Sequence, residues 1–364
     1  MVTRKPITKD TKKDTTKVKK ESNAADKLQD AEDDDEDDLI SSIIVDLNKK
    51  DSGAAMTLEN ATHAQVNGWI PSGHPDIDDA LSGGRGWPLG RVVELYGPES
   101  NGKTTVALHA IAEIQKMGGI AIFLDTEHAL DRSRAKTIGV NLKKMIYAQP
   151  ETMEDVFEFI EEIIGTIRKK DPNRPVLIVW DSVAATAARV EVEGDYGDHN
   201  VGVHGRIMSQ GFRKINPLIN KEKICFMCIN QVRDKVGVTF GEKTSTPGGR
   251  ALKFYASVRL EVIKIGQYKE GSEVAGIKCI ATAKKNKVAP PFKKADFNIV
   301  FDPIHGGIDG MGALLDKGFD AGIFGDSKGW YVIDDKKYRK SDARVFLKEN
   351  PDTAKKFYDT LSAM

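Results

Sequence analysis

Residues 97–105, GPESNGKTT, contain the spacing GxxxxGKT, whose fixed positions are Gly97, Gly102, Lys103 and Thr104. The glycines allow backbone amides to face phosphate oxygens at the positive end of a following helix. A lysine at this position reaches the β- and γ-phosphates, and a threonine after it offers its hydroxyl to Mg²⁺. The pattern therefore predicts a site for a nucleoside triphosphate with Mg²⁺.

Polar residues at three further predicted strand ends could complete a hydrolytic site. Asp181 ends the apolar run PVLIVWD, Glu127 follows the run IAIFLD, and Gln231 ends CINQ. The carboxyl ends of the strands in an α/β sheet meet at one crevice. We therefore expect Asp181 to support the metal, Glu127 to orient or deprotonate water, and Gln231 to sense the γ-phosphate.

The elements that must position these residues alternate along the chain. The run RVVELY predicts a strand before the phosphate loop, and VALHAIAEIQKM predicts a helix after it. Thr152 and Asp155 form a predicted capping box ahead of another amphipathic helix. SVRLEVIKI, GIKCIATAKK and DFNIVF are typical of antiparallel strands, and Asn350-Pro351 predicts the start of the last helix. We expect an α/β P-loop NTPase core with a mostly parallel central sheet, a short N-terminal helix and a small C-terminal α+β domain.

Composition and pattern divide the chain into four predicted segments. They are a disordered charged tail at 1–36, a segment with a short helix at 37–68, a nucleotide-binding α/β core at 69–304, and a C-terminal domain at 305–364. The acidic run DAEDDDEDD is interpreted either as a solvated tether or as a mimic of a nucleic-acid backbone. In the second segment Leu39, Ile43, Ile44 and Leu47 lie on one helical stripe.

Charge and hydropathy exclude several classes of protein. Lys plus Arg and Asp plus Glu both number 54, so any contact with nucleic acid must depend on local loops and not on a global positive field. No apolar run approaches the roughly 20 residues of a membrane helix, and the Lys-rich start lacks a signal-peptide core, so we expect a cytoplasmic protein. Cys225 and Cys228 lie in one strand-like run and should point to opposite faces as packing residues.

The motifs GPESNGKTT, LDTEHALD, WDSVAA, MSQGFRK, INQVR and GGRALKFYASVRL together closely resemble bacterial and phage RecA-family recombinases. The resemblance extends from about residue 37 to the end of the chain, and it implies an oligomerisation role for segment 37–68 and an ATPase and DNA-binding core at 69–304. It implies an enzyme that forms helical filaments on single-stranded DNA and hydrolyses ATP in a DNA-dependent way. It also implies strand exchange with homologous double-stranded DNA in recombination, repair and the SOS response to DNA damage. Single-strand binding and loader proteins are further partners that the family suggests.

The resemblance also implies roles for individual residues. Catalysis would depend on Glu127, Lys103 and Gln231. The phosphates would be bound by the loop residues Gly97, Pro98, Glu99, Ser100, Asn101, Gly102, Lys103, Thr104 and Thr105. Thr104 and Asp181 would hold the metal, Asp131 and Arg134 would face the base, and Lys285 and Lys287 would reach the ATP of a neighbouring subunit. The residues implied to bind DNA are Arg206, Ser209, Arg213, Arg233, Lys235, Val236, Gly248, Gly249 and Arg250.

Two of these positions depart from the family. Arg134 stands where the family usually has an aromatic ring that stacks on adenine, and Arg250 stands where an asparagine is typical. A guanidinium can also stack on a base. The difference at Arg134 therefore leaves open which nucleotide the protein prefers.

Two other functions remain open from the residues alone. A ring-shaped RecA-fold ATPase or helicase should carry a folded N-terminal helical domain and an arginine finger, whereas this chain has a charged tail and a lysine pair. A non-catalytic scaffold that coats DNA and keeps ATP as a structural ligand would not need Glu127 as a water-activating carboxylate.

Overall fold

The computed structural model describes residues 38–49, 55–61, 65–195, 202–234, 244–270, 272–324 and 330–362. Contacts divide the chain into two units, residues 1–64 and residues 65–364. In the first unit, residues 38–48 form a helix on which Leu39, Ile43 and Leu47 are exposed. All the labelled elements belong to the second unit.

A nine-stranded sheet runs through the described part of the second unit. Its order is β13 (Gly307–Ile308), β12 (Lys294–Val300), β11 (Glu273–Asn286), β10 (Val258–Glu270), β3 (Arg91–Gly97), β7 (Ile224–Gln231), β6 (Val176–Asp181), β4 (Ile120–Asp125) and β5 (Met145–Ala148). Neighbours from β10 to β5 are parallel, whereas those from β10 to β13 are antiparallel. The predicted α/β fold with a mostly parallel core is confirmed.

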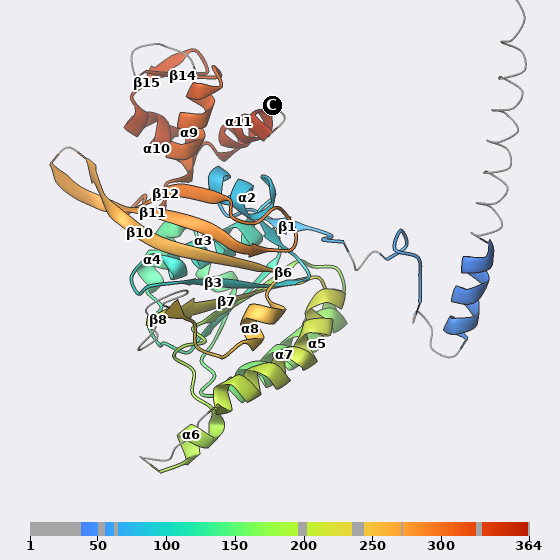
Figure 1. Ribbon diagram of the computed structural model, residues 1–364. Helices are drawn as coiled ribbons and strands as arrows, with labels where there is room; N and C mark the ends of the chain where they lie inside the picture. Colours follow the sequence, from blue (N-terminus) through green and yellow to red (C-terminus); the bar gives the residue numbers. More distant parts are fainter. Residues whose placement is uncertain are drawn as a thin grey trace, which may run out of the picture. The chain divides into compact units, whose positions relative to one another are not determined.

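Helices cover both faces of this sheet (Figure 1). One face packs against α3 (Lys103–Lys116) and α4 (Arg132–Ile138), and the other against α5 (Met153–Lys170) and α7 (Val203–Lys221). Strand residues alternate between the faces, so Cys225 lies in one hydrophobic cluster and Cys228 in the other. The expectation that these cysteines are buried packing residues on opposite faces is confirmed.

The start of α5 follows the sequence prediction. The Thr152 hydroxyl accepts a hydrogen bond from the Asp155 amide at 3.1 Å, and the Asp155 carboxylate accepts one from the Thr152 amide at 3.0 Å. This capping box satisfies amides that have no partner inside the helix. Ile160 and Ile164 on the same helix are buried against the sheet.

The long hairpin of β10 and β11 extends beyond the body of the sheet (Figure 1). Past β13, the C-terminal elements surround a hydrophobic cluster of their own that includes Leu315, Phe324 and Leu347. These elements are α9 (Gly310–Asp320), β14 (Tyr331–Ile333), β15 (Lys336–Tyr338), α10 (Lys340–Glu349) and α11 (Pro351–Ser362). The last helix begins at Pro351, as Asn350-Pro351 predicts.

Short elements connect the larger ones. They are β1 (Trp69–Ile70), α2 (Pro75–Ser82), β2 (Trp87–Pro88), a 3₁₀ turn (Leu142–Lys144), α6 (Arg189–Glu193), β8 (Arg233–Asp234), β9 (Thr244–Ser245) and α8 (Ala251–Tyr255). Among the described residues, no helix is both long and apolar enough to cross a membrane.

Candidate active site

The phosphate loop joins the end of β3 to the start of α3, and its shape requires glycine at two positions. Gly102 has φ of 87°, and a Cβ there would lie 2.1 Å from Ile299 Cδ1. Gly97 has φ of 155°, and a Cβ there would lie 2.1 Å from the Val262 carbonyl oxygen. Side chains at these positions would clash or strain the backbone, so the shape of the loop requires both glycines of the motif.

Lys103 is buried at the first position of α3. Its Nζ donates to the carbonyl oxygens of Gly97 at 3.0 Å and Pro98 at 2.7 Å. Burial lowers the pKa of Lys103, while the nearby carboxylates, Asp181 first among them, act in the opposite direction. The loop thus holds the ammonium group against its own carbonyls at the edge of a cavity.

The next residue, Thr104, donates its hydroxyl to Asp181 Oδ2 at 2.7 Å. Asp181 is buried at the end of β6. Burial raises the pKa of Asp181 to about 7; the Thr104 hydrogen bond and Lys103 lower it, whereas the Glu127 and Asp125 carboxylates raise it. A hydroxyl and a carboxylate oxygen therefore converge beside the phosphate loop, as a hard cation requires.

Glu127 lies where three strand ends meet. Its Oε1 accepts hydrogen bonds from the Ser182 hydroxyl and from Gln231 Nε2, the latter at 2.9 Å. The Thr126 amide donates to the Asp181 carbonyl at 2.9 Å and fixes the turn before Glu127. The ends of β4, β6 and β7 thus bring together Glu127, Asp181 and Gln231, which the sequence placed at separate strand ends. The contact from Ser182 was not predicted, although Ser182 directly follows Asp181.

These side chains line a cavity of ≈730 Å³ beside the loop. Its wall contains the predicted residues Glu99, Ser100, Asn101, Gly102, Lys103, Thr104, Thr105, Glu127, Arg134, Asp181 and Gln231. Gly97 and Pro98 are not part of this wall and contribute the carbonyls that hold Lys103. A second cavity of ≈340 Å³ is lined by Asp131 and Arg134, so it lies next to the first.

Lys285 and Lys287 do not line either cavity. Lys285 Nζ donates to the carbonyl oxygens of Lys253 at 2.7 Å and Phe254 at 2.9 Å, and Lys287 Nζ lies 6.0 Å from the Phe254 ring centre. Burial lowers the pKa of Lys285 to about 8, with further lowering by Lys287 and Arg259. The structure therefore separates this lysine pair from the cavity beside the phosphate loop.

A buried ion pair that sequence reasoning missed lies close to Lys285. Arg259 on β10 pairs with Glu94 on β3, and the Glu94 side chain is fully buried. Asn230 Nδ2 donates to Glu94 Oε1 at 3.2 Å and to the Pro247 carbonyl at 3.1 Å. Because Asn230 precedes Gln231, this network connects the end of β7 to the segment around Pro247. No local sequence pattern signals a pair 165 residues apart.

The described residues that are predicted to bind DNA lie on α7, in β8 and in the segment 248–250. Arg206 and Arg213 are exposed on α7, and Ser209 donates its hydroxyl to the Gly205 carbonyl. A Cβ at Gly249 would lie 3.2 Å from Gly205 Cα, so the two segments touch. The other predicted residues in the described ranges are Arg233, Gly248 and Arg250.

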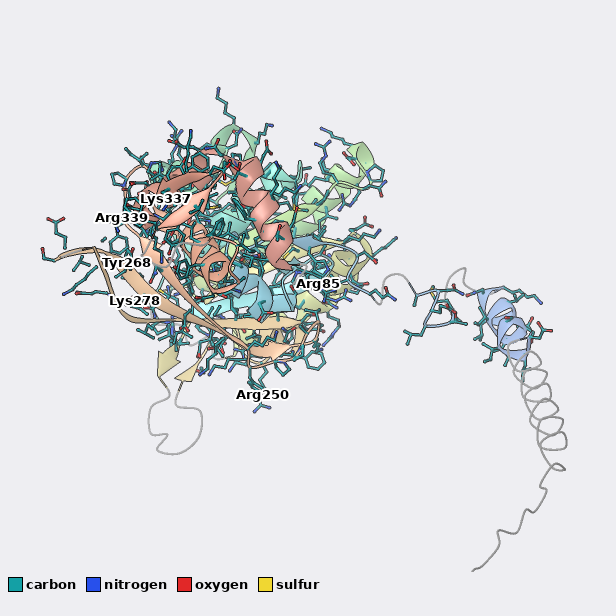
Figure 2. All side chains as sticks on the ribbon, turned by 90° about the horizontal axis from the view of Figure 1, so that it is seen from above. Arg85, Arg250, Tyr268, Lys278, Lys337 and Arg339 are labelled. Atoms are coloured by element: carbon teal, nitrogen blue, oxygen red, sulfur yellow. The ribbon has the colours of Figure 1, made fainter. Side chains whose placement is uncertain are left out.

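These remaining residues differ in exposure. Arg233 in β8 pairs with Ser245 in β9, and Gly248 is buried beside Met208. Arg250 is exposed and its side chain points outward from the surface (Figure 2). Lys235 and Val236 lie outside the described residues.

A family model and individual known proteins that match this chain all point to the same family. The family model described as RecA N-terminal domain matches residues 39–307. The chain is 45% identical to "Protein RecA" of Bacillus subtilis (strain 168) over 302 residues, which cover 82% of this chain and 84% of that protein. It is 46% identical to "Protein RecA" of Halalkalibacterium halodurans over 306 residues, which cover 83% and 84%. Combined with the phosphate loop and the three strand ends that meet beside it, these matches establish that the chain belongs to the RecA family of recombinases.

Proposed function

We propose that this chain binds single-stranded DNA as a helical filament, hydrolyses ATP while bound, and exchanges strands with homologous double-stranded DNA in recombination and repair. The observation that carries the proposal is the meeting of Lys103, Thr104, Glu127, Asp181 and Gln231 at one cavity. The same proposal includes a cytoplasmic location, because DNA and ATP are the substrates. It also includes single-strand binding and loader proteins as helpers, which the family suggests.

Magnesium is part of this proposal because the available donors suit it. Mg²⁺ is usually bound through one or two carboxylates together with substrate phosphates, and here Thr104 and Asp181 present a hydroxyl and a carboxylate oxygen 2.7 Å apart. When bound there, Mg²⁺ would neutralise charge that develops on the β- and γ-phosphates.

The hydrolytic step is assigned to Glu127. Its carboxylate is oriented by Ser182 and Gln231, and in this role it accepts the proton of the water that attacks the γ-phosphate. Lys103 leaves its contacts with the loop carbonyls and supplies positive charge to the phosphates. Lys103 is buried and Glu127 is half-buried, which suits both roles, since charges act more strongly where water is excluded.

Gln231 is proposed to connect ATP with DNA. It bonds Glu127 at one side, and two residues later the chain enters β8, which pairs with β9 in the predicted DNA-binding region. A γ-phosphate that draws Gln231 away from Glu127 would shift the start of β8. By thermodynamic linkage, ATP and DNA should then strengthen each other's binding.

The filament is proposed to form with ATP between subunits. Lys285 and Lys287, which lie away from the cavity of their own chain, would reach the phosphates of a neighbour. The exposed apolar residues of the helix at 38–48 would pack on that neighbour. Head-to-tail contacts that do not close into a ring produce a helical filament. The proposal also includes the division of the chain into the four segments 1–36, 37–68, 69–304 and 305–364.

The test is ATP hydrolysis by the full-length chain with and without single-stranded DNA, together with electron microscopy. We expect DNA to stimulate hydrolysis by the wild type. Glu127→Gln should lose hydrolysis while it still forms filaments with ATP and DNA. Glu162→Gln, an exposed glutamate on α5, is the matched control and should behave as the wild type.

The same experiment separates the rival functions. Hydrolysis that does not respond to DNA, together with closed rings in micrographs, would favour a ring ATPase. ATP-dependent coating of DNA with no hydrolysis by the wild type would favour a scaffold. Either outcome would contradict the proposed function.

A further inference from the structure

The phosphate cavity and the smaller cavity beside it share two side chains, Arg134 and Phe301. Among the described residues that line the smaller cavity, Phe301 carries the only aromatic ring. This ring is 55% exposed, so it is available to a ligand. If the larger cavity holds the phosphates, as the proposed function requires, the smaller one holds the nucleoside.

Arg134 is held at both ends of its side chain. Its backbone lies in the first turn of α4, where Asp131 Oδ1 accepts the Ser133 amide at 2.8 Å and the Arg134 amide at 3.2 Å. Its Nη2 donates to the Thr105 hydroxyl at 2.6 Å. Thr105 is buried in the first turn of α3, directly after the GKT of the phosphate loop. The guanidinium group is therefore tied to the phosphate loop and does not simply extend toward a base.

The contact of Arg134 with Thr105 and its place between the two cavities indicate which part of the phosphate chain it would reach. In a GxxxxGKT loop, the lysine reaches the β- and γ-phosphates, and the loop amides hold the α- and β-phosphates. Thr105 lies beyond Lys103 and Thr104, and its partner Arg134 opens onto the nucleoside cavity. The guanidinium group therefore lies at the ribose end of the phosphate cavity. Of its five N–H donors, one is used by Thr105 in the contact above.

We propose that Arg134 is a phosphate clamp that binds the α-phosphate of the nucleoside triphosphate. Arg134 then contributes to affinity by binding the phosphate charge, and not by stacking on the base. Two consequences distinguish this role from a stacking role. Loss of the guanidinium group weakens every ligand that carries the phosphate chain, including one with no base at all. Arg134 itself then does not discriminate between purine bases.

The experiment measures binding of ATP, GTP and inorganic tripolyphosphate to the full-length chain by isothermal titration calorimetry. We expect Arg134→Gln to weaken all three by a similar factor of about ten, the size of one charge-assisted hydrogen bond. Arg134→Lys, which keeps the charge but not the planar geometry, should lose less. Arg132→Gln is the matched control, since Arg132 lies on the same helix and lines neither cavity.

Three results would overturn the inference. Weaker binding of ATP and GTP by Arg134→Gln with unchanged tripolyphosphate binding would assign Arg134 to the base. Unchanged binding of all three ligands would remove Arg134 from the site. Failure of the wild type to bind ATP would refute the proposed function itself and this inference with it. Thermal unfolding of each variant separates loss of binding from loss of the fold.

Discussion

The Thr104 hydroxyl and the Asp181 carboxylate, 77 residues apart in the chain, are joined by a hydrogen bond of 2.7 Å. This contact connects the phosphate loop to the end of β6 and so holds the loop and the strand together. It also brings together the two oxygen donors that the proposed magnesium site requires. Substitution of Thr104 therefore tests both the metal site and the connection.

Thr104→Val keeps the shape of the side chain and removes its hydroxyl. We expect kcat/KM for ATP with single-stranded DNA to fall by about a hundredfold or more, equivalent to roughly 3 kcal/mol of transition-state stabilisation. Thr104→Ser retains the oxygen and should keep most of the activity. Equal activity of the valine and serine variants would show that this hydroxyl does not contribute to hydrolysis.

The buried pair of Glu94 and Arg259 predicts a large effect on stability. Glu94→Gln leaves the Arg259 guanidinium, whose side chain is 12% exposed, without its anion. Breaking a buried pair from one side costs about 3–5 kcal/mol, and we expect the free energy of unfolding in urea to fall by that amount. Asp79→Asn breaks the exposed pair with Lys293 and should cost less than about 1 kcal/mol. Similar costs for the two variants would contradict the role given to the buried pair.

The sequence contains strong signals for the phosphate loop, the strands and the capped helices because each depends on residues close together in the chain. Asp181, Glu127 and Gln231 could also be placed, since parallel strands bring their carboxyl ends to one edge. The contacts of Glu94 with Arg259, and of Thr105 with Arg134, could not be predicted in this way. They depend on which strands are neighbours in the sheet and on where α4 packs, and no local pattern encodes either.

A site shared between subunits predicts complementation between inactive variants. Glu127→Gln removes the proposed base, and Lys285→Gln removes the group that would reach a neighbour's phosphate, so each variant alone should lose DNA-stimulated hydrolysis. In mixed filaments, some subunit interfaces combine an intact Glu127 from one variant with an intact Lys285 from the other. We therefore expect the mixture to hydrolyse ATP.

The measurement is ATP hydrolysis by the two variants alone and at equal concentrations on single-stranded DNA. Lys294→Gln, an exposed lysine on β12, is the matched control and should remain active by itself. If the mixture is as inactive as its components, Lys285 acts within its own chain or has no role in the reaction.

The contact between Asp78 on α2 and Tyr358 on α11 predicts a pH-dependent stability. Asp78 is buried and accepts hydrogen bonds from the Ser72 amide at 2.8 Å and the Tyr358 hydroxyl at 2.9 Å. Burial raises the pKa of Asp78 from 3.8 to about 6, although both hydrogen-bond partners lower it. The folded chain thus holds this proton at a higher pH than the unfolded chain does. The stabilising contribution is complete below about pH 3.8 and is lost as the pH rises through about 6.

Asp78→Asn removes this titration. The free energy of unfolding of the variant, relative to the wild type, should rise by up to roughly 3 kcal/mol between about pH 4 and pH 8 in urea denaturation. Tyr358→Phe should have the opposite dependence, because the tyrosine hydroxyl stabilises the ionised carboxylate more than the protonated one. Its cost should therefore be larger at pH 8 than at pH 4. A constant difference between Asp78→Asn and the wild type across this range would mean that Asp78 titrates alike in the folded and unfolded chains.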